Sequence, residues 1–175
     1  PPIYISDLIV IIKTIIEKAE ELNYSVIEAL KGVTVSKCII VGPTIDEFTD
    51  VAAKAVDKRE NDMIGDGYAE ETVMNAASVQ MKCTLDNGKN VLLCGDASPD
   101  YLKDLSDYDI IQLPHHGQEN DAKAIFEKLG GNSYCKDYLI SDNTGSGKNS
   151  GGSYDIVEYM EKEKYKPAFN TKNGI

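Results

Sequence analysis

The sequence predicts an α/β protein in which helices cover a mixed β-sheet. Two short apolar runs bounded by Gly or Pro, Val91–Cys94 and Tyr108–Leu113, are typical of strands buried on both faces. An Asp-Asn-Gly-Lys turn at 86–89 precedes the first run, and Asn-Gly between two β-rich runs favours a tight hairpin. Helical patterns alternate with these strands, as they do in layered α/β folds.

Five segments have helical periodicity. Ser6 is placed to cap the first, which runs to about Leu22. Thr44 or Asp46 starts the second, which reaches roughly Val56. The expected inner face of the first helix consists of Leu8, Ile11, Ile12, Ile15, Ile16 and Ala19. The other three are a short helix near Pro99–Leu105, an amphipathic one at Asn120–Leu129 ended by Gly130-Gly131, and one at Tyr154–Lys164.

The remaining segments are predicted as strands and loops. Val33–Val41 is expected to be one strand, which Gly42-Pro43 ends. Val26–Leu30 fits either a strand or a turn of helix, and the polar stretch Asp57–Glu71 is expected to be an exposed loop. The other strands are Ala77–Leu85 and Asn90–Cys94, which form the hairpin, then Tyr108–Leu113, Tyr134–Ser141 and Ala168–Thr171.

Length and composition indicate one globular domain over residues 1–175. The chain is 42% hydrophobic and 27% charged, and no segment has the roughly eighteen uninterrupted apolar residues of a membrane span. It has no signal-peptide pattern, so a cytoplasmic location is expected. It starts with Pro1-Pro2 and stops at Gly174-Ile175, where a strand begins, so we expect a piece of a longer protein.

The formal net charge of −11 argues against a broad nucleic-acid-binding surface, which normally needs clustered Lys and Arg. A nuclease is still compatible with this charge, because bound divalent cations can supply local positive charge. Arg59 is the single arginine, which leaves little scope for bidentate phosphate clamps. Otherwise the acidity indicates a solvated surface.

The four cysteines are far apart in sequence and form no C-x-x-C pair. Cys38, Cys83 and Cys94 lie within apolar or alternating strand patterns, and Cys135 stands alone. This pattern predicts reduced core thiols rather than a disulfide framework or a zinc cluster.

Asp96 is the first candidate for chemistry, because it lies on a Gly-Asp turn directly after a buried strand. There a carboxylate can bridge two divalent metals or act as a general base. The alternative is a structural role, in which Asp96 caps the short helix that follows.

His115 and His116 are the second candidates and the two histidines of the chain. Adjacent histidines on a turn point in different directions, so at most one is expected to ligate a metal. The other could donate a hydrogen bond or carry a proton. A structural role for both is the alternative.

Two other polar stretches carry weaker signals. Asn75 and Ser78 open a hairpin strand, where polar side chains commonly stabilise the turn. Alternatively, they could support a site at the edge of the sheet where the strands end. The loop Ser141–Gly147 lacks the Gly-Lys-Ser/Thr end of a P-loop and the spacing of a dinucleotide-binding fingerprint, so neither is predicted.

Taken in order, these motifs resemble the second half of a metallo-β-lactamase-fold hydrolase, in the branch found in ComEC-type DNA-uptake proteins. The resemblance covers roughly Val33 to the C-terminus. The motifs that carry it are NAASV at 75–79, VLLCGDA at 91–97 and DIIQLPHHG at 109–117, with VGPT at 41–44 and NTKNGI at 170–175.

The resemblance implies an αββα sandwich, incomplete at its N-terminus, and a metal-dependent hydrolase acting on a phosphodiester or related ester. Two metal ions, zinc or manganese, would activate a water. Asp96 would bridge the metals, His115 would ligate one of them, and His116 would act in catalysis. Asn149–Ser153 lacks the histidine that this branch often carries there, so no catalytic role is expected for it.

The family's H-x-H-x-D-H ligand cluster belongs to its first half and does not occur in this sequence. The resemblance therefore implies that a missing N-terminal half or a partner chain completes the site. The alternatives are a non-catalytic interaction module that keeps half of the fold without a complete metal site, or an α/β protein of another kind. Half of such a sandwich would expose an apolar face.

Overall fold

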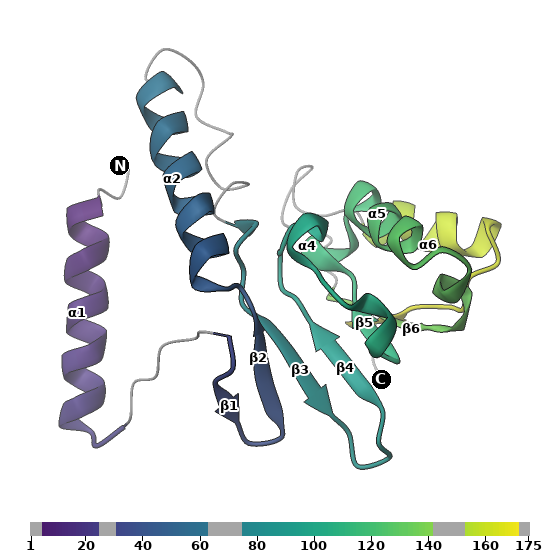
Figure 1. Ribbon diagram of the computed structural model, residues 1–175, viewed down its shortest axis with the longest axis horizontal. Coiled ribbons are helices and arrows are strands. Elements are labelled where there is room, and N and C mark those ends of the chain that lie inside the picture. Colours follow the sequence, from purple (N-terminus) through teal and green to yellow (C-terminus); the bar gives the residue numbers. More distant parts are fainter. Residues whose placement is uncertain (1–4, 25–30, 63–74, 142–152, 172–175) are drawn as a thin grey trace.

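The computed structural model describes residues 5–24, 31–62, 75–141 and 153–171, and its strands form one mixed sheet (Figure 1). The strands lie in the sheet in sequence order, and the first four pair antiparallel while the last four pair parallel. This confirms the α/β class. The strands are β1 (Thr34–Val35), β2 (Cys38–Gly42), β3 (Gln80–Thr84), β4 (Asn90–Leu93), β5 (Ile110–Gln112), β6 (Asp137–Ile140) and β7 (Phe169–Asn170).

Helices α4, α5 and α6 gather beside β5 and β6, whereas α1 stands apart from the sheet (Figure 1). The predicted short helix near residue 99 is two turns of 3₁₀ helix, η1 and η2. No described helix is long and apolar enough to cross a membrane. The helices are α1 (Ile5–Glu21), α2 (Ile45–Asp62), η1 (Pro99–Tyr101), η2 (Leu105–Asp107), α4 (Pro114–Gly117), α5 (Glu119–Leu129), η3 (Gly130–Cys135) and α6 (Ser153–Lys162).

Helix α1 forms where its sequence predicts it, but the expected inner face is wrong at Ile15. This side chain is 62% exposed, while Ile16 and Ala19 are half-buried. The side chains of Leu8, Ile11 and Ile12 lie outside the described residues. Amphipathic spacing predicts the helix, but which surface it covers depends on tertiary packing.

The start of α2 has a local cause in the sequence. The Thr44 N–H donates to the Glu47 carboxylate at 2.8 Å, and the Glu47 N–H donates to the Thr44 hydroxyl at 3.2 Å. This reciprocal capping box satisfies backbone donors at the helix start. The helix extends to Asp62, so the loop predicted from residue 57 is wrong over its first residues, and residues 63–71 lie outside the described part.

The prediction of one strand over Val33–Val41 is wrong, because the chain reverses inside it. Ser36 has φ 55°, and β1 pairs antiparallel with β2 on either side of this turn. The Ile40 N–H donates to the Val33 carbonyl at 2.8 Å. A continuous apolar run gives no signal for a two-residue reversal that lacks Asn-Gly.

The hydrophobic core lies on one face of the sheet, under α5, α6, η1 and η2. Leu92, Ile111 and Tyr138 are register partners on neighbouring strands, and all are at most 1% exposed. Phe126 of α5 meets the Tyr138 ring at 5.0 Å, edge to face. The remaining core residues around them include Leu113, Ile125, Ile140, Ile156 and Met160.

The opposite face of the sheet carries apolar side chains that stay partly or largely exposed. Val35 is 52% exposed and Phe169 is 62% exposed, and the register places both on this face. The four-layer sandwich implied by the resemblance remains a prediction, since the described strands make one sheet.

A disulfide on this same face joins Cys38 and Cys83, which are register partners of β2 and β3 with Cα atoms 4.1 Å apart. The prediction of reduced thiols is therefore wrong for this pair, while Cys94 is buried and free as expected. Cys135 is free but exposed, so it is not a core thiol. Disulfides persist in oxidising compartments, so this pair is not what the expected cytoplasmic location predicts.

Candidate functional site

The two sequence-predicted turns come together at the carboxyl edge of β4 and β5. These strands are parallel neighbours, so the residues that follow them reach the same edge of the sheet. The His115 N–H donates to the Gly95 carbonyl at 3.2 Å, which fastens the Pro-His-His-Gly turn to the Gly-Asp turn. Asp96 and His115 therefore lie on turns that are directly bonded.

The Pro-His-His-Gly turn has an unusual backbone. His115, His116 and Gly117 all have positive φ, at 51°, 58° and 73°. Residues with side chains adopt this left-handed region at a cost, and such strain recurs at functional sites. The burial of Pro114 and Gly117 and the bond to Gly95 hold the turn in place.

Gly117→Ala should destabilise the folded protein by about 1–3 kcal/mol, since it adds left-handed strain and a crowded methyl group. A Cβ at this position would lie 3.2 Å from Cγ2 of both Ile140 and Ile156, which are core residues. Urea unfolding of the two proteins measures the change. Gly88→Ala is the matched control, because it has φ 82° but nothing within 4 Å of its Cβ. Equal losses in the two variants would show that crowding contributes nothing.

His116 is oriented by the end of β6. Its Nδ1 lies 2.7 Å from the Ser141 carbonyl oxygen and 3.4 Å from the Ser141 hydroxyl. Because a carbonyl oxygen only accepts, Nδ1 carries the proton and Nε2 of the neutral ring is an acceptor. This arrangement, in which a backbone carbonyl fixes the tautomer, is the one that metal-binding and proton-transferring histidines use.

His115 faces a different partner, Asp121 in the first turn of α5. Its Nδ1 lies 3.9 Å from Oδ2 of Asp121, and the two imidazole rings are 6.3 Å apart and tilted by 59°. The two histidines therefore diverge, as expected for adjacent residues on a turn. Burial raises the pKa of Asp121, the His115 charge lowers it, and the Asp96 charge raises it again.

Asp121 was not among the predicted site residues. In the sequence it looks like an ordinary acidic residue in the first turn of a helix. The Gln118 side chain accepts from the Asp121 N–H at 2.9 Å and so caps α5. The signal that could have identified it is the short spacing from the His-His turn, which keeps the first turn of α5 close to the same edge.

Asp121→Asn should flatten the dependence of stability on pH and stabilise the protein at neutral pH. The pKa of Asp121 is raised in the folded state, so that state binds the proton more tightly than the unfolded chain does. Stability from this group is therefore present at low pH and lost as pH rises through the folded pKa. Urea unfolding between about pH 4 and 7 tests this. Asp86→Asn, on an exposed turn residue, is the control, and parallel curves for Asp121→Asn and the unchanged protein would contradict the assignment.

Cys94 lies beneath the Gly-Asp turn and is a structural thiol. Burial, followed by the charge of Asp96, raises its pKa to about 12. Its Sγ donates to the Gln112 carbonyl at 2.9 Å, and its N–H donates to the Gln112 side-chain oxygen at 3.2 Å. A thiol that stays protonated at neutral pH is a poor nucleophile.

The segment containing Asn75 and Ser78 packs against the same turn. The Ser98 N–H donates to the Ala76 carbonyl at 3.3 Å, and a Cβ at Gly95 would lie 3.4 Å from Cβ of Ser78. Ser78 thus lies beside the Gly-Asp turn, and its supporting role stays a prediction. The loop from residue 142, including Asn149, lies outside the described residues.

The side chains at this edge do not by themselves fit a pair of metal ions. Over residues 5–24, 31–62, 75–141 and 153–171, no three His, Cys, Asp or Glu side chains group so as to hold one. Asp96, His115, His116 and Asp121 supply possible ligands from one side. Further ligands would have to come from elsewhere.

No family model, curated protein or solved structure matches this chain.

Proposed function

We propose that this chain supplies one side of the active site of a metal-dependent hydrolase that acts on a phosphodiester or related ester. The observation that carries the proposal is the 2.7 Å contact from Nδ1 of His116 to the Ser141 carbonyl, next to the Asp96 turn. It leaves an acceptor nitrogen on a fixed ring at the edge of the sheet where α/β proteins bind their ligands.

Each side chain has a role that its contacts support. His116 Nε2 can take up a proton, because Nδ1 is committed as a donor to Ser141. Asp96 presents a half-buried carboxylate from the neighbouring turn, and Asp121 orients His115. In the family that the sequence resembles, two zinc or manganese ions lower the pKa of a bound water. The remaining ligands would come from a longer chain or a partner.

Metal content and hydrolysis measured on the same preparation test the proposal. We expect elemental mass spectrometry to find close to two zinc or manganese ions per active unit, and bis(p-nitrophenyl) phosphate to be hydrolysed by the metal-loaded sample. Intact mass shows whether a segment beyond these 175 residues is present. No metal and no hydrolysis in a sample that contains such a segment or partner would overturn the proposal.

A second candidate is an interaction module that keeps the fold without a metal site. Val35 in β1 and Phe169 in β7 favour it, because they are exposed apolar side chains at the two edges of the sheet, on the face opposite the core, where a partner could cover them. The same metal measurement separates the two candidates, since the module would bind a partner without metal.

A further inference from the structure

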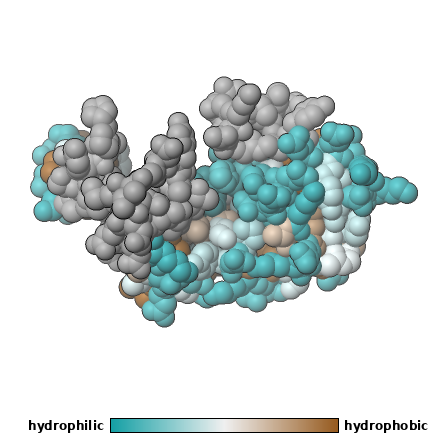
Figure 2. Space-filling model, turned by 90° about the horizontal axis from the view of Figure 1, so that it is seen from above, coloured by the Kyte–Doolittle hydropathy of each residue, from teal (hydrophilic) through white to brown (hydrophobic). Residues whose placement is uncertain are grey.

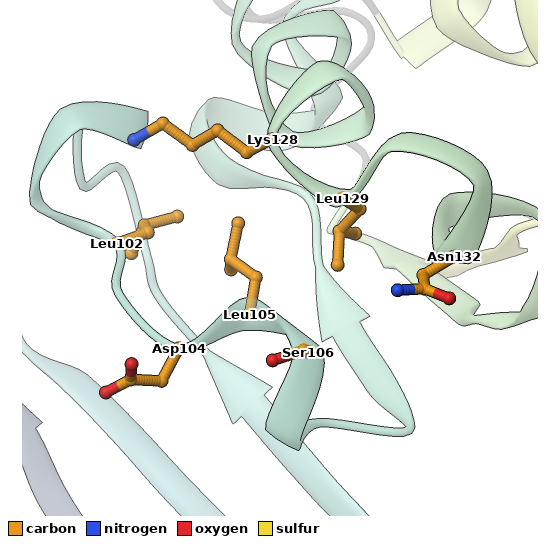
Figure 3. A pocket seen from close by; sticks show the side chains of 7 residues that line it. All are labelled: Leu102, Asp104, Leu105, Ser106, Lys128, Leu129 and Asn132. Carbon is orange, nitrogen blue, oxygen red and sulfur yellow. The ribbon is translucent and has the colours of Figure 1, made fainter.

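Two cavities lie on the covered side of the sheet, away from the Asp96 edge. The first, about 280 Å³, lies between η1, η2 and α5 (Figure 3). Its leucines point inward, and Lys128 donates to the Pro99 carbonyl. Figure 3 shows the Asp104 carboxylate pointing away from this cavity. None of the described side chains that line it is a buried polar group without a hydrogen-bond partner, so no ligand is inferred there.

The second cavity, about 220 Å³, lies between the start of α2, β3 and the η1–η2 segment. Gln80 and Lys82 line it together with Leu92, because alternate residues of a strand face the same side and Lys82 is the register partner of Leu92. Two tyrosines, Tyr101 and Tyr108, complete its wall.

The side chain of Gln80 is the unusual feature of this cavity. It is 3% exposed, and its Nε2 has no hydrogen-bond partner among the described residues. A buried donor left unpaired is costly and rare in folded proteins, and a water, an ion or a ligand in the cavity can satisfy it. Gly42 leaves room for this amide, since a Cβ at Gly42 would lie 2.7 Å from both Cδ and Oε1 of Gln80.

The charges around the cavity have both signs. Lys103 pairs with Glu47, so that pair is neutralised internally. Lys31 and Lys82 have no ion pair among the described residues, although Lys82 lies 5.9 Å above the Tyr108 ring. On the other side, the exposed residues Asp104 and Asp107 line the cavity. The charge of Asp104 acts on Lys103, whereas Asp107 has no basic partner in the described part of the chain. Cationic and anionic side chains therefore both line the cavity.

We propose that this cavity binds a small zwitterion of amino-acid size. Its carboxylate would accept from Gln80 Nε2 and the Lys82 ammonium, which project from the same strand. Its ammonium group would face Asp104 and Asp107 in the η2 segment. A charge-assisted contact at each end would fix the orientation of the bound zwitterion and make the cavity bind it more tightly than a singly charged molecule. The proposal is independent of the hydrolase function.

The Gln80 side-chain amide is itself the probe for this proposal. In a two-dimensional ¹⁵N–¹H spectrum its NH₂ signals are assigned by their loss in Gln80→Leu. The common L-amino acids are added one at a time up to about 10 mM, which detects dissociation constants in the millimolar range. We expect at least one to shift these signals saturably, and acetate and inorganic phosphate to bind about tenfold more weakly.

Matched variants test the two ends of the site. Lys82→Met, which keeps most of the side-chain length, should weaken binding about tenfold, and so should Asp104→Asn. Asn tolerates the left-handed backbone of residue 104 (φ 51°), so this second variant remains informative if Lys82→Met does not fold. Lys37→Met, on an exposed turn residue that pairs with Asp86, should bind normally.

Three results would overturn the proposal. No saturable shift with any amino acid would show that a water satisfies Gln80. Equal binding of acetate would show that Asp104 and Asp107 contribute nothing. Unchanged affinity in both Lys82→Met and Asp104→Asn would place the binding elsewhere on the protein.

Discussion

Asp96→Asn is expected to reduce kcat/KM for phosphodiester hydrolysis by at least about 100-fold while leaving the fold intact, because one preorganised charged group at such a site contributes that much. The folded state should not lose stability. The charge of Asp96 raises the pKa of both Cys94 and Asp121, so its removal relieves repulsion with Asp121. Steady-state kinetics of the metal-loaded protein and urea unfolding of the metal-free protein measure the two effects.

Asp86→Asn is the matched control for this variant, since it removes the same charge from the exposed hairpin turn between β3 and β4. Asp86 lies at the opposite end of β4 from Asp96, and its side chain is 90% exposed. Its kinetics should be unchanged. Full activity of Asp96→Asn would remove this carboxylate from the mechanism, even if the protein proves to be a hydrolase.

Reduction of the Cys38–Cys83 disulfide is expected to lower the free energy of unfolding by about 4 kcal/mol, because the bond closes a long loop in the unfolded chain. The two cysteines are 45 residues apart in sequence. For a domain of ordinary stability this is a large fraction of the total. Urea unfolding with and without a thiol reductant gives the difference.

The Cys38→Ala, Cys83→Ala double variant separates the disulfide from other effects of the reductant. Its urea midpoint should equal that of the reduced protein, and added thiol should not change this midpoint, because Cys94 and Cys135 form no disulfide. Identical unfolding of the oxidised and reduced unchanged protein would show that the bond does not form in solution or adds nothing.

The surface is predicted well by composition. Figure 2 shows hydrophilic side chains over most of the described surface on the side viewed from above, as a formal net charge of −11 indicates. Such a surface limits the partners that charge alone can attract.

Much of the fold could be predicted from local sequence, because its signals are local. The Asn-Gly hairpin between β3 and β4, the capped start of α2 and the strands that end at Gly95 and Pro114 each depend on a few adjacent residues. The edge formed by β4 and β5 followed from them, since parallel neighbours place their carboxyl ends together.

The features that were missed depend on pairings distant in sequence or on weak turns. The register of β2 against β3 places Cys38 opposite Cys83, and the spacing of the cysteines in the sequence does not predict that register. The reversal at Ser36 has no glycine or asparagine to mark it. Asp121 lies near His115 because α5 starts directly after the left-handed turn at residues 115–117.

The strand order of the sheet has a consequence for how the chain folds. Each strand pairs with its neighbour in sequence, and the hairpins β1–β2 and β3–β4 close short loops at little entropic cost, whereas the parallel pairs need longer connections. The connection between β2 and β3, residues 43–79, is the longest between neighbouring described strands. We therefore expect the pairing of β2 with β3 to be the slowest step in the assembly of this sheet. The Cys38–Cys83 disulfide joins these same two strands once they have paired.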